Sequence, residues 1–135
     1  MAAKHIVVTR LAIALDTCDW AAATAVLDES CAYCIGDDVH HGPDAIIASY
    51  RRAHERAVQM FDCIEYESAV ACQDDHCVIR YADHVEYGGH THTHACEQDV
   101  WVSEAGLIVR IVHRDVPGER DALNRFLRRC GLPAR

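Results

Sequence analysis

The spacing of apolar residues changes near residue 60, and this change constrains the fold more than any other feature of the sequence. Before it, apolar residues recur with the 3.6-residue period of helices; after it, apolar and polar residues alternate as in half-buried strands. The alternating segments are Phe61–Gln73, His76–Tyr87, Thr91–Ser103 and Leu107–Asp115. Short turn sequences separate them, as expected for hairpins. The second half of the chain therefore predicts a four-stranded antiparallel meander.

The rest of the chain predicts mainly helices. Asp19 is a typical N-cap, and Pro43 suits the first position of a helix. The expected helices and the one short hairpin cover residues 4–16, 20–28, 31–41 (the hairpin), 43–59 and 117–130. Long antiparallel strands beside helices indicate an α+β fold. We expect one domain over residues 1–135, with a strongly curved sheet wrapped around the N-terminal helices in the shape of a cone.

A two-residue loop at Asp74-Asp75 would fix the register of the first hairpin in the meander. In that register Cys72 faces Cys77, and Tyr66 faces Asp83. Apolar residues then gather on one face of both strands, while glutamates and Arg80 gather on the other. The consistency of the two strands supports this register.

Composition and charge exclude several classes of protein. The chain has 50% hydrophobic residues, a formal net charge of -8 and a pI near 5.6. Such an acidic folded protein repels phosphate backbones, so we expect no nucleic-acid partner. No apolar run approaches transmembrane length, and the N-terminus lacks the order of a signal peptide, so we expect no membrane association and a cytoplasmic location.

Eight cysteines are scattered through the predicted helices and strands. In a reducing cytoplasm we expect them to be free thiols, including the facing pair Cys72 and Cys77. Cys31 and Cys34 form a single CxxC, but an extended segment would point their side chains to opposite faces, so a redox or zinc role is not expected.

His113 and Asp115 lie two residues apart on the last strand and therefore share a face with Val109 and Ile111. A carboxylate and an imidazole above apolar residues suit acid–base chemistry in a dry pocket. The alternative is that Asp115 caps the helix beginning at Pro117 and that His113 only bonds to it.

Asp83 is the second catalytic candidate. In the register above it lies on the apolar face, opposite Tyr66 and near Tyr81. It could act as a general base whose phenolic neighbours stabilise a developing enolate. The alternative is a structural pair of Asp83 and a tyrosine at a strand end.

His90, His92 and His94 alternate along one strand and so share a face. Two of them could bind a metal with a third ligand from Cys96, His113 or Asp115. The alternative, which we favour, is that they are ordinary surface histidines beside the Gly88-Gly89 turn, with no metal bound.

Several short phrases resemble one known family. They are Asp19-Trp20, His41-Gly42-Pro43-Asp44-Ala45-Ile46, Val78-Ile79-Arg80-Tyr81, Cys96-Glu97-Gln98, Gly106-Leu107-Ile108-Val109-Arg110-Ile111 and His113-Arg114-Asp115. Their order and spacing resemble the SnoaL-like branch of the nuclear transport factor 2-like (NTF2-like) superfamily, which includes ketosteroid isomerases, scytalone dehydratases and polyketide cyclases. The resemblance implies a cone-shaped fold with one apolar pocket, often dimeric, and it places Asp115 where SnoaL-like cyclases carry an acid/base aspartate.

The resemblance leaves the reaction open, because this fold serves enzymes and non-enzymes. One reading is a cofactor-independent isomerase, cyclase or dehydratase that acts on a small apolar molecule. The others are a non-catalytic ligand-binding or dimerisation module and a histidine-based metal site. A homodimer is expected in either of the first two. The residues expected to line the pocket are Trp20, Tyr33, Tyr50, Tyr66, Tyr81, Val109 and Ile111.

Overall fold

The structure is a computed structural model that describes residues 2–134. Over this range the helices are α1 (Ala2–Asp16), α2 (Trp20–Ala25), α3 (Pro43–Met60) and α4 (Glu119–Arg129). The strands are β1 (Leu27–Ile35), β2 (Asp38–His41), β3 (Cys63–Cys72), β4 (Cys77–Tyr87), β5 (His90–Val102) and β6 (Ile108–Asp115). No helix in the described range has the length and apolar character needed to cross a membrane.

All six strands belong to one sheet with the order β2-β1-β6-β5-β4-β3. The predicted meander is present, because β3, β4, β5 and β6 pair antiparallel in sequence order. The β1–β2 hairpin joins it through a parallel pairing of β1 with β6. This parallel pairing was not predicted, since the contact between β1 and β6 is not encoded in the local pattern of either strand.

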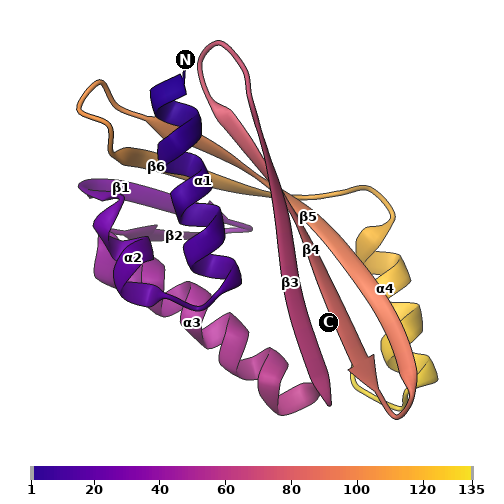
Figure 1. The fold of residues 1–135 in the computed structure, drawn as a ribbon. Helices are drawn as coiled ribbons and strands as arrows, with labels where there is room; N and C mark the ends of the chain where they lie inside the picture. Colours follow the sequence, from indigo (N-terminus) through magenta and orange to yellow (C-terminus); the bar gives the residue numbers. More distant parts are fainter. Residues whose placement is uncertain (1, 135) are drawn as a thin grey trace.

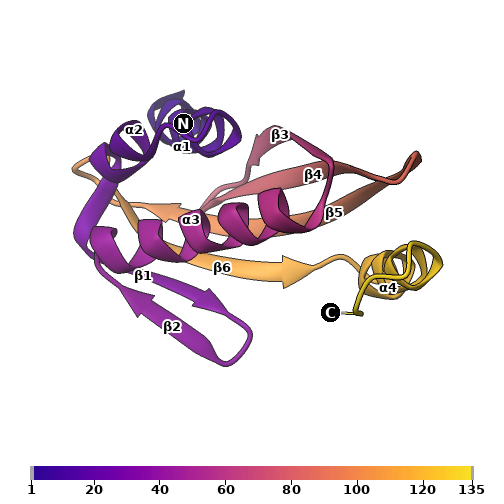
Figure 2. The ribbon, with the colours of Figure 1, turned by 90° about the horizontal axis from the view of Figure 1, so that it is seen from below.

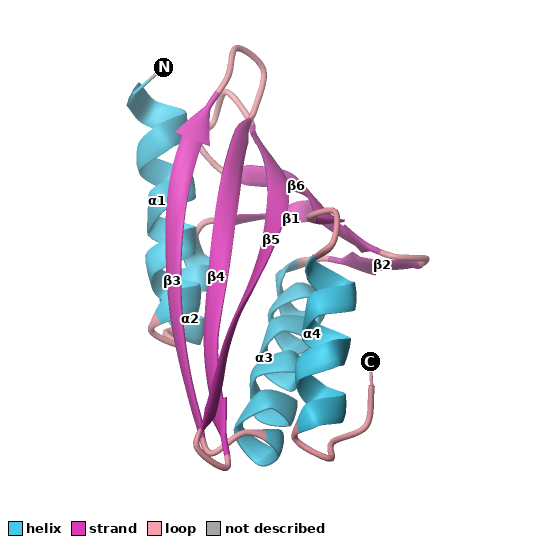
Figure 3. Ribbon diagram, turned by 90° about the vertical axis from the view of Figure 1, so that its right-hand side faces the viewer, coloured by secondary structure: helices cyan, strands magenta, loops and turns pink. Residues whose placement is uncertain are grey.

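The sheet is strongly curved but open, and α3 lies within its concavity (Figures 1 and 2). Helix α1 runs beside β3, and α4 lies against β5 toward the far end of the long strands (Figures 1 and 3). The main core lies between α1, α3 and the sheet, with fully buried Leu11, Ile46, Ile79 and Ile111. The predicted α+β architecture, a curved sheet wrapped around helices, is confirmed.

A second, smaller core attaches α4. Leu123, Phe126 and Leu127 of α4 pack with Phe61 and Val85, separately from the main cluster. This apolar stripe packs against the sheet, while at the start of α4 Glu119 accepts a hydrogen bond from the backbone amide of Ala95 and Arg120 pairs with Asp115.

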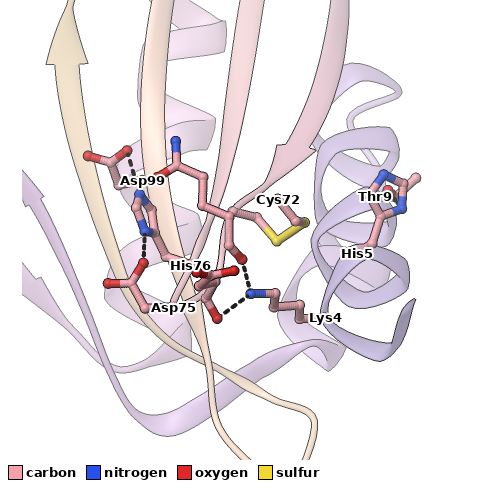
Figure 4. The surroundings of a disulfide bond; sticks show 10 residues. Lys4, His5, Thr9, Cys72, Asp75, His76 and Asp99 are labelled. Atoms are coloured by element: carbon pink, nitrogen blue, oxygen red, sulfur yellow. Dashed lines mark hydrogen bonds and ion pairs between the residues drawn. A yellow bond between two sulfur atoms is a disulfide. The ribbon is translucent and has the colours of Figure 1, made fainter. Parts of the chain in front are cut away.

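The predicted register of β3 and β4 is confirmed, with Tyr66 opposite Asp83 and Cys72 opposite Cys77. The expectation of free thiols at this pair is wrong, because Cys72 and Cys77 form a disulfide (Figure 4). The antiparallel register places their Cα atoms 3.9 Å apart at the start of the turn. The Lys4 ammonium donates to the carbonyl oxygens of Gln73 and Asp74, which ties α1 to the same turn.

Several element boundaries differ from the prediction by two or three residues. Helix α2 ends at Ala25 rather than at residue 28, because the chain enters β1 at Leu27. Helix α4 begins at Glu119 rather than at Pro117, because Gly118 precedes it with a left-handed φ of 85°. In α3, Val58 is 54% exposed, whereas His54 lines the cavity on the inward face of the helix.

Candidate functional site

The concave face of the sheet holds a cavity of about 220 Å³. It is walled by all four helices and by every strand except β2. Its wall is largely apolar and aromatic, with Trp20, Tyr33 and Tyr50 among the large side chains. The carboxylate, imidazole and amide side chains in the wall are Asp16, His54, Asp83, His94, Gln98 and His113.

Asp83 lies on the cavity side of β4 between two polar neighbours. Strand pairing places it directly opposite Tyr66 of β3 and His94 of β5. Burial and then the charge of Asp83 raise the pKa of the Tyr66 phenol above its usual value. The same two causes raise the pKa of the Cys96 thiol to about 12. The charge of Asp83 therefore acts on groups of both neighbouring strands, Tyr66 of β3 and Cys96 of β5.

His54 forms a second polar group at the cavity wall. Its Nδ1 lies 2.8 Å from the Tyr66 hydroxyl, and its Nε2 lies 3.6 Å from the Cys18 sulfur. The ring also lies near the indole of Trp20, with centroids 6.1 Å apart. Sequence reasoning missed His54, although it follows Tyr50 by four residues and so shares its helical face.

Gln98 is 3% exposed and joins three of the residues around it. The Tyr50 hydroxyl donates to its Oε1 at 2.7 Å, and its Nε2 donates to the Tyr33 hydroxyl at 3.1 Å. The same amide nitrogen lies 3.3 Å from Nδ1 of His113. The pairing of β5 with β6 also resolves the register of the last hairpin, because Gln98 rather than Glu97 faces the cavity.

His113 lines the cavity, while Asp115 does not. His113 Nε2 lies 3.2 Å from Asp115, so both of its ring nitrogens have partners. With Gln98 donating to Nδ1, the ring proton belongs on Nε2, where it is directed at Asp115.

Asp115 points toward α4 rather than into the cavity. Its carboxylate accepts from the guanidinium of Arg120 at 3.1 and 3.4 Å, and it is 44% exposed. The hydrogen bond from Arg120, followed in effect by its charge and by His113, lowers the pKa of this carboxyl below its usual value. Asp115 therefore neither caps α4 through a backbone amide nor has the raised pKa expected of a buried acid.

Two buried polar atoms at the cavity have no hydrogen-bond partner within residues 2–134: the Tyr81 hydroxyl and Nδ1 of His94. Tyr81 is 8% exposed, and burial raises the pKa of its phenol well above the usual value. A buried hydroxyl without a partner costs free energy, roughly 1–3 kcal/mol, unless a bound molecule satisfies it. These two groups are thus available to a ligand.

Asp16, at the end of α1, is a second carboxylate in the cavity wall, and sequence reasoning did not single it out. It accepts a hydrogen bond of 2.5 Å from the Ser68 hydroxyl. Burial is the main cause of its raised pKa, and the charge of Glu67 adds to it.

Five of the seven residues expected to line a pocket do so: Trp20, Tyr33, Tyr50, Tyr66 and Tyr81. Ile111 instead belongs to the main core, where it is fully buried, and Val109 lies outside the cavity wall. The register of the β5–β6 pairing shifts between Arg110 and Ile108. Val109 lies at this irregularity and therefore does not follow the in–out alternation that places His113 in the cavity wall.

The three alternating histidines of β5 have different surroundings. His90 is exposed, His92 stacks on Phe126 with ring centroids 5.1 Å apart, and His94 lines the cavity. No group of three or more His, Cys, Asp or Glu side chains in residues 2–134 is arranged to hold a metal ion. The geometry thus gives no support to a histidine-based metal site.

Comparison with known proteins links this chain to others through structure alone. No protein-family profile matches the sequence, and no curated protein sequence matches it either. Solved structures do match. A proposed polyketide cyclase from Xanthomonas campestris aligns with a TM-score of 0.65 at 18% identity, covering 83% of this chain and 89% of that one.

Two further structures show the same similarity. An NTF2-like protein of unknown function from Exiguobacterium aligns with a TM-score of 0.63 at 16% identity, covering 82% of this chain and 98% of that one. An epoxide hydrolase from Mycobacterium tuberculosis, described as LEH-like, aligns with a TM-score of 0.65 at 18% identity, covering 93% and 92%. The chain therefore has the NTF2-like fold, as the resemblance in its sequence implied.

Proposed function

We propose that the protein is a cofactor-independent isomerase, cyclase or dehydratase that moves a proton on a small, largely apolar molecule, with Asp83 as the general base. The observation that carries the proposal is the place of Asp83 in the cavity, flanked by Tyr66 and His94 and close to Tyr81. A carboxylate beside an apolar wall and an unsatisfied phenol suits abstraction of a proton next to a carbonyl group.

In this scheme Asp83 takes a proton from a carbon atom adjacent to the carbonyl. The C–H bond breaks, and its electron pair moves to the carbonyl oxygen to give an enolate. The Tyr81 hydroxyl donates a hydrogen bond to that oxygen, which replaces the partner it lacks within residues 2–134. Asp83 then returns the proton to a different carbon, so no cofactor is required.

His113 acts in this proposal as a positioning residue. Its two ring nitrogens are directed at Gln98 and Asp115, and Gln98 in turn holds the hydroxyls of Tyr33 and Tyr50. Asp115 would fix the orientation of His113 rather than exchange protons with the substrate. This assigns to Asp83 the acid–base role that the family resemblance gives to Asp115.

The names of similar structures support small-molecule chemistry on this fold, since one is a proposed polyketide cyclase and another an epoxide hydrolase. We also propose a homodimer, because the family that the sequence resembles is often dimeric. Light scattering of the purified protein should give twice the mass of 15.1 kDa, and a mass near 15 kDa would contradict the dimer.

Hydrogen–deuterium exchange on small carbonyl compounds tests the proposed chemistry without knowledge of the natural substrate. A panel of ketones and 1,3-diketones is incubated with the protein in D2O and followed by NMR. Asp83→Asn should reduce any protein-catalysed exchange at least about a hundredfold, as expected for the loss of a general base. Glu86→Gln removes the same charge from the opposite face of β4 and should leave the exchange unchanged.

A non-catalytic binding module is the second candidate. It is favoured by one observation: the predicted pair His113 and Asp115 is occupied by Gln98 and Arg120 and does not present a free base to the cavity. Binding of a carbonyl compound with no exchange above the Asp83→Asn background would favour this module over the enzyme.

A further inference from the structure

The cavity wall holds carboxylates and three imidazoles, those of His54, His94 and His113, but no permanent cation among the described residues. Asp16 and Asp83 contribute two carboxylates, and no lysine or arginine is among the lining residues in the described part of the chain. The whole protein carries a formal net charge of -8, so its outer field does not oppose this local potential. A negatively charged ligand would be repelled by such a wall.

Aromatic rings make up much of the same wall. Trp20, Tyr33, Tyr50, Phe61, Tyr66 and Tyr81 all line the cavity. The faces of aromatic rings attract cations, and indole is the strongest of them. Several aromatic rings with a carboxylate nearby are a recognised way to hold a substituted ammonium group, which is large and weakly hydrated.

A buried polar group of the wall is also available to a ligand. The Tyr81 hydroxyl has no partner within residues 2–134 although Tyr81 is more than nine-tenths buried. A ligand oxygen could accept from this hydroxyl while a cationic nitrogen lies among the rings and carboxylates. The wall therefore offers a donor for an oxygen atom and a negative, aromatic surface for a cation.

We infer that the cavity takes a small organic cation, a substituted ammonium compound that also carries an oxygen atom, rather than a purely apolar molecule. This inference rests on the proposed function only in placing the ligand in the same cavity. The nitrogen cation would lie between the aromatic rings and Asp83, and its oxygen would accept from Tyr81.

Three probes of nearly the same size and shape test the sign of the ligand charge. They are choline, the neutral 3,3-dimethyl-1-butanol and the anionic 3,3-dimethylbutanoate, titrated separately by calorimetry. Because the three have nearly the same shape, differences in affinity report charge. Choline should bind at least about tenfold more tightly than the neutral alcohol, and the anion most weakly.

Variants of the cavity wall test whether the preference for choline over the neutral alcohol arises in the cavity. Asp83→Asn should weaken choline about tenfold and leave the neutral alcohol nearly unaffected, whereas Glu86→Gln, with the same loss of charge on the outer face, should change neither. Trp20→Leu keeps an apolar wall without a π face and should also weaken choline more than the alcohol. It provides the test if Asp83→Asn fails to fold.

Equal or tighter binding of the neutral alcohol would overturn the inference while leaving a binding cavity in place. An equal loss of choline affinity in Glu86→Gln and Asp83→Asn would also overturn it, because the effect would then come from the overall charge. Failure of all three probes at millimolar concentration would overturn it too. The exchange assay on carbonyl compounds would still decide the proposed chemistry separately.

Discussion

The rings of Tyr33 and Tyr50 stack with their centroids 4.8 Å apart and their planes 8° from parallel. Both hydroxyls bond to the amide of Gln98, so one buried side chain links β1, α3 and β5 at the cavity wall. Burial raises the pKa of both phenols, which keeps them protonated near neutral pH. This stack is the rigid wall against which a ligand would lie.

Replacing Gln98 should be costly for this reason. Gln98→Leu leaves the buried hydroxyls of Tyr33 and Tyr50 without their partner, and unsatisfied buried groups cost roughly 1–3 kcal/mol each. The free energy of unfolding should fall by at least about 2 kcal/mol, measured by urea denaturation. Gln59→Leu, on the exposed face of α3, is the matched control and should change it by less than about 0.5 kcal/mol.

Acid should destabilise the contact between α4 and the sheet. Burial is the first cause of the lowered pKa of both His92 and His94. The charge of Glu119 in α4 raises the pKa of both rings and so opposes burial. The charges of Arg125 and Arg129 lower the pKa of His92 further, and that of Arg120 lowers the pKa of His94. Asp115 raises the pKa of His94, while His92 lowers it.

The direction follows from proton uptake. Because the folded pKa values lie below the usual histidine pKa of 6.5, the unfolded chain binds more protons near and below that pH. The stabilising contribution of the neutral rings is therefore full above pH 6.5 and declines as the pH falls below it. Urea midpoints between pH 7.5 and 5 should show this loss.

The double variant His92→Gln and His94→Gln should flatten the pH dependence in that window. His90→Gln, at an exposed position of the same strand, should leave it unchanged. An unaltered slope in the double variant would show that other groups cause the acid sensitivity.

The disulfide between Cys72 and Cys77 should be detectable chemically. Denatured protein that has not been reduced should titrate six of its eight thiols, because six cysteines are free in the structure. Closing so short a loop restricts the unfolded chain enough for a stabilisation of about 2 kcal/mol. Cys72→Ser should lose about that much, while Cys63→Ser, at an exposed free thiol, should lose little; recovery of all eight thiols would contradict the bond.

The strands could be predicted from the sequence because alternation is a local signal. The facing of Tyr66 and Asp83 followed from the loop at Asp74-Asp75 and from the requirement that apolar residues share a face. The same register brought Cys72 opposite Cys77, and only the assumption of a reducing compartment led to the wrong prediction of free thiols.

The features that could not be predicted from the sequence depend on contacts between elements that are distant in the chain. Asp16 reaches the cavity because α1 packs against the sheet, and no local pattern gives that placement, whereas His54 could have been found from the helical face that it shares with Tyr50. Asp115 was predicted to serve the cavity, but Arg120 on the following helix attracts its carboxylate. The parallel pairing of β1 with β6 likewise joins segments about 75 residues apart, which periodicity alone does not reveal.

The central claim is that the concave cavity, and no other surface, is the ligand site. The two tryptophans report on it directly, because Trp20 lines the cavity while Trp101 stacks with His76 and lies under Arg110 on the other face of the sheet. The measurement is a titration of the ¹⁵N-labelled protein with choline, observing the two indole N–H signals. The indole signal of Trp20 should shift in a saturable way while that of Trp101 stays fixed. A saturable shift of Trp101 alone, or no shift of Trp20 at saturating probe, would contradict the account.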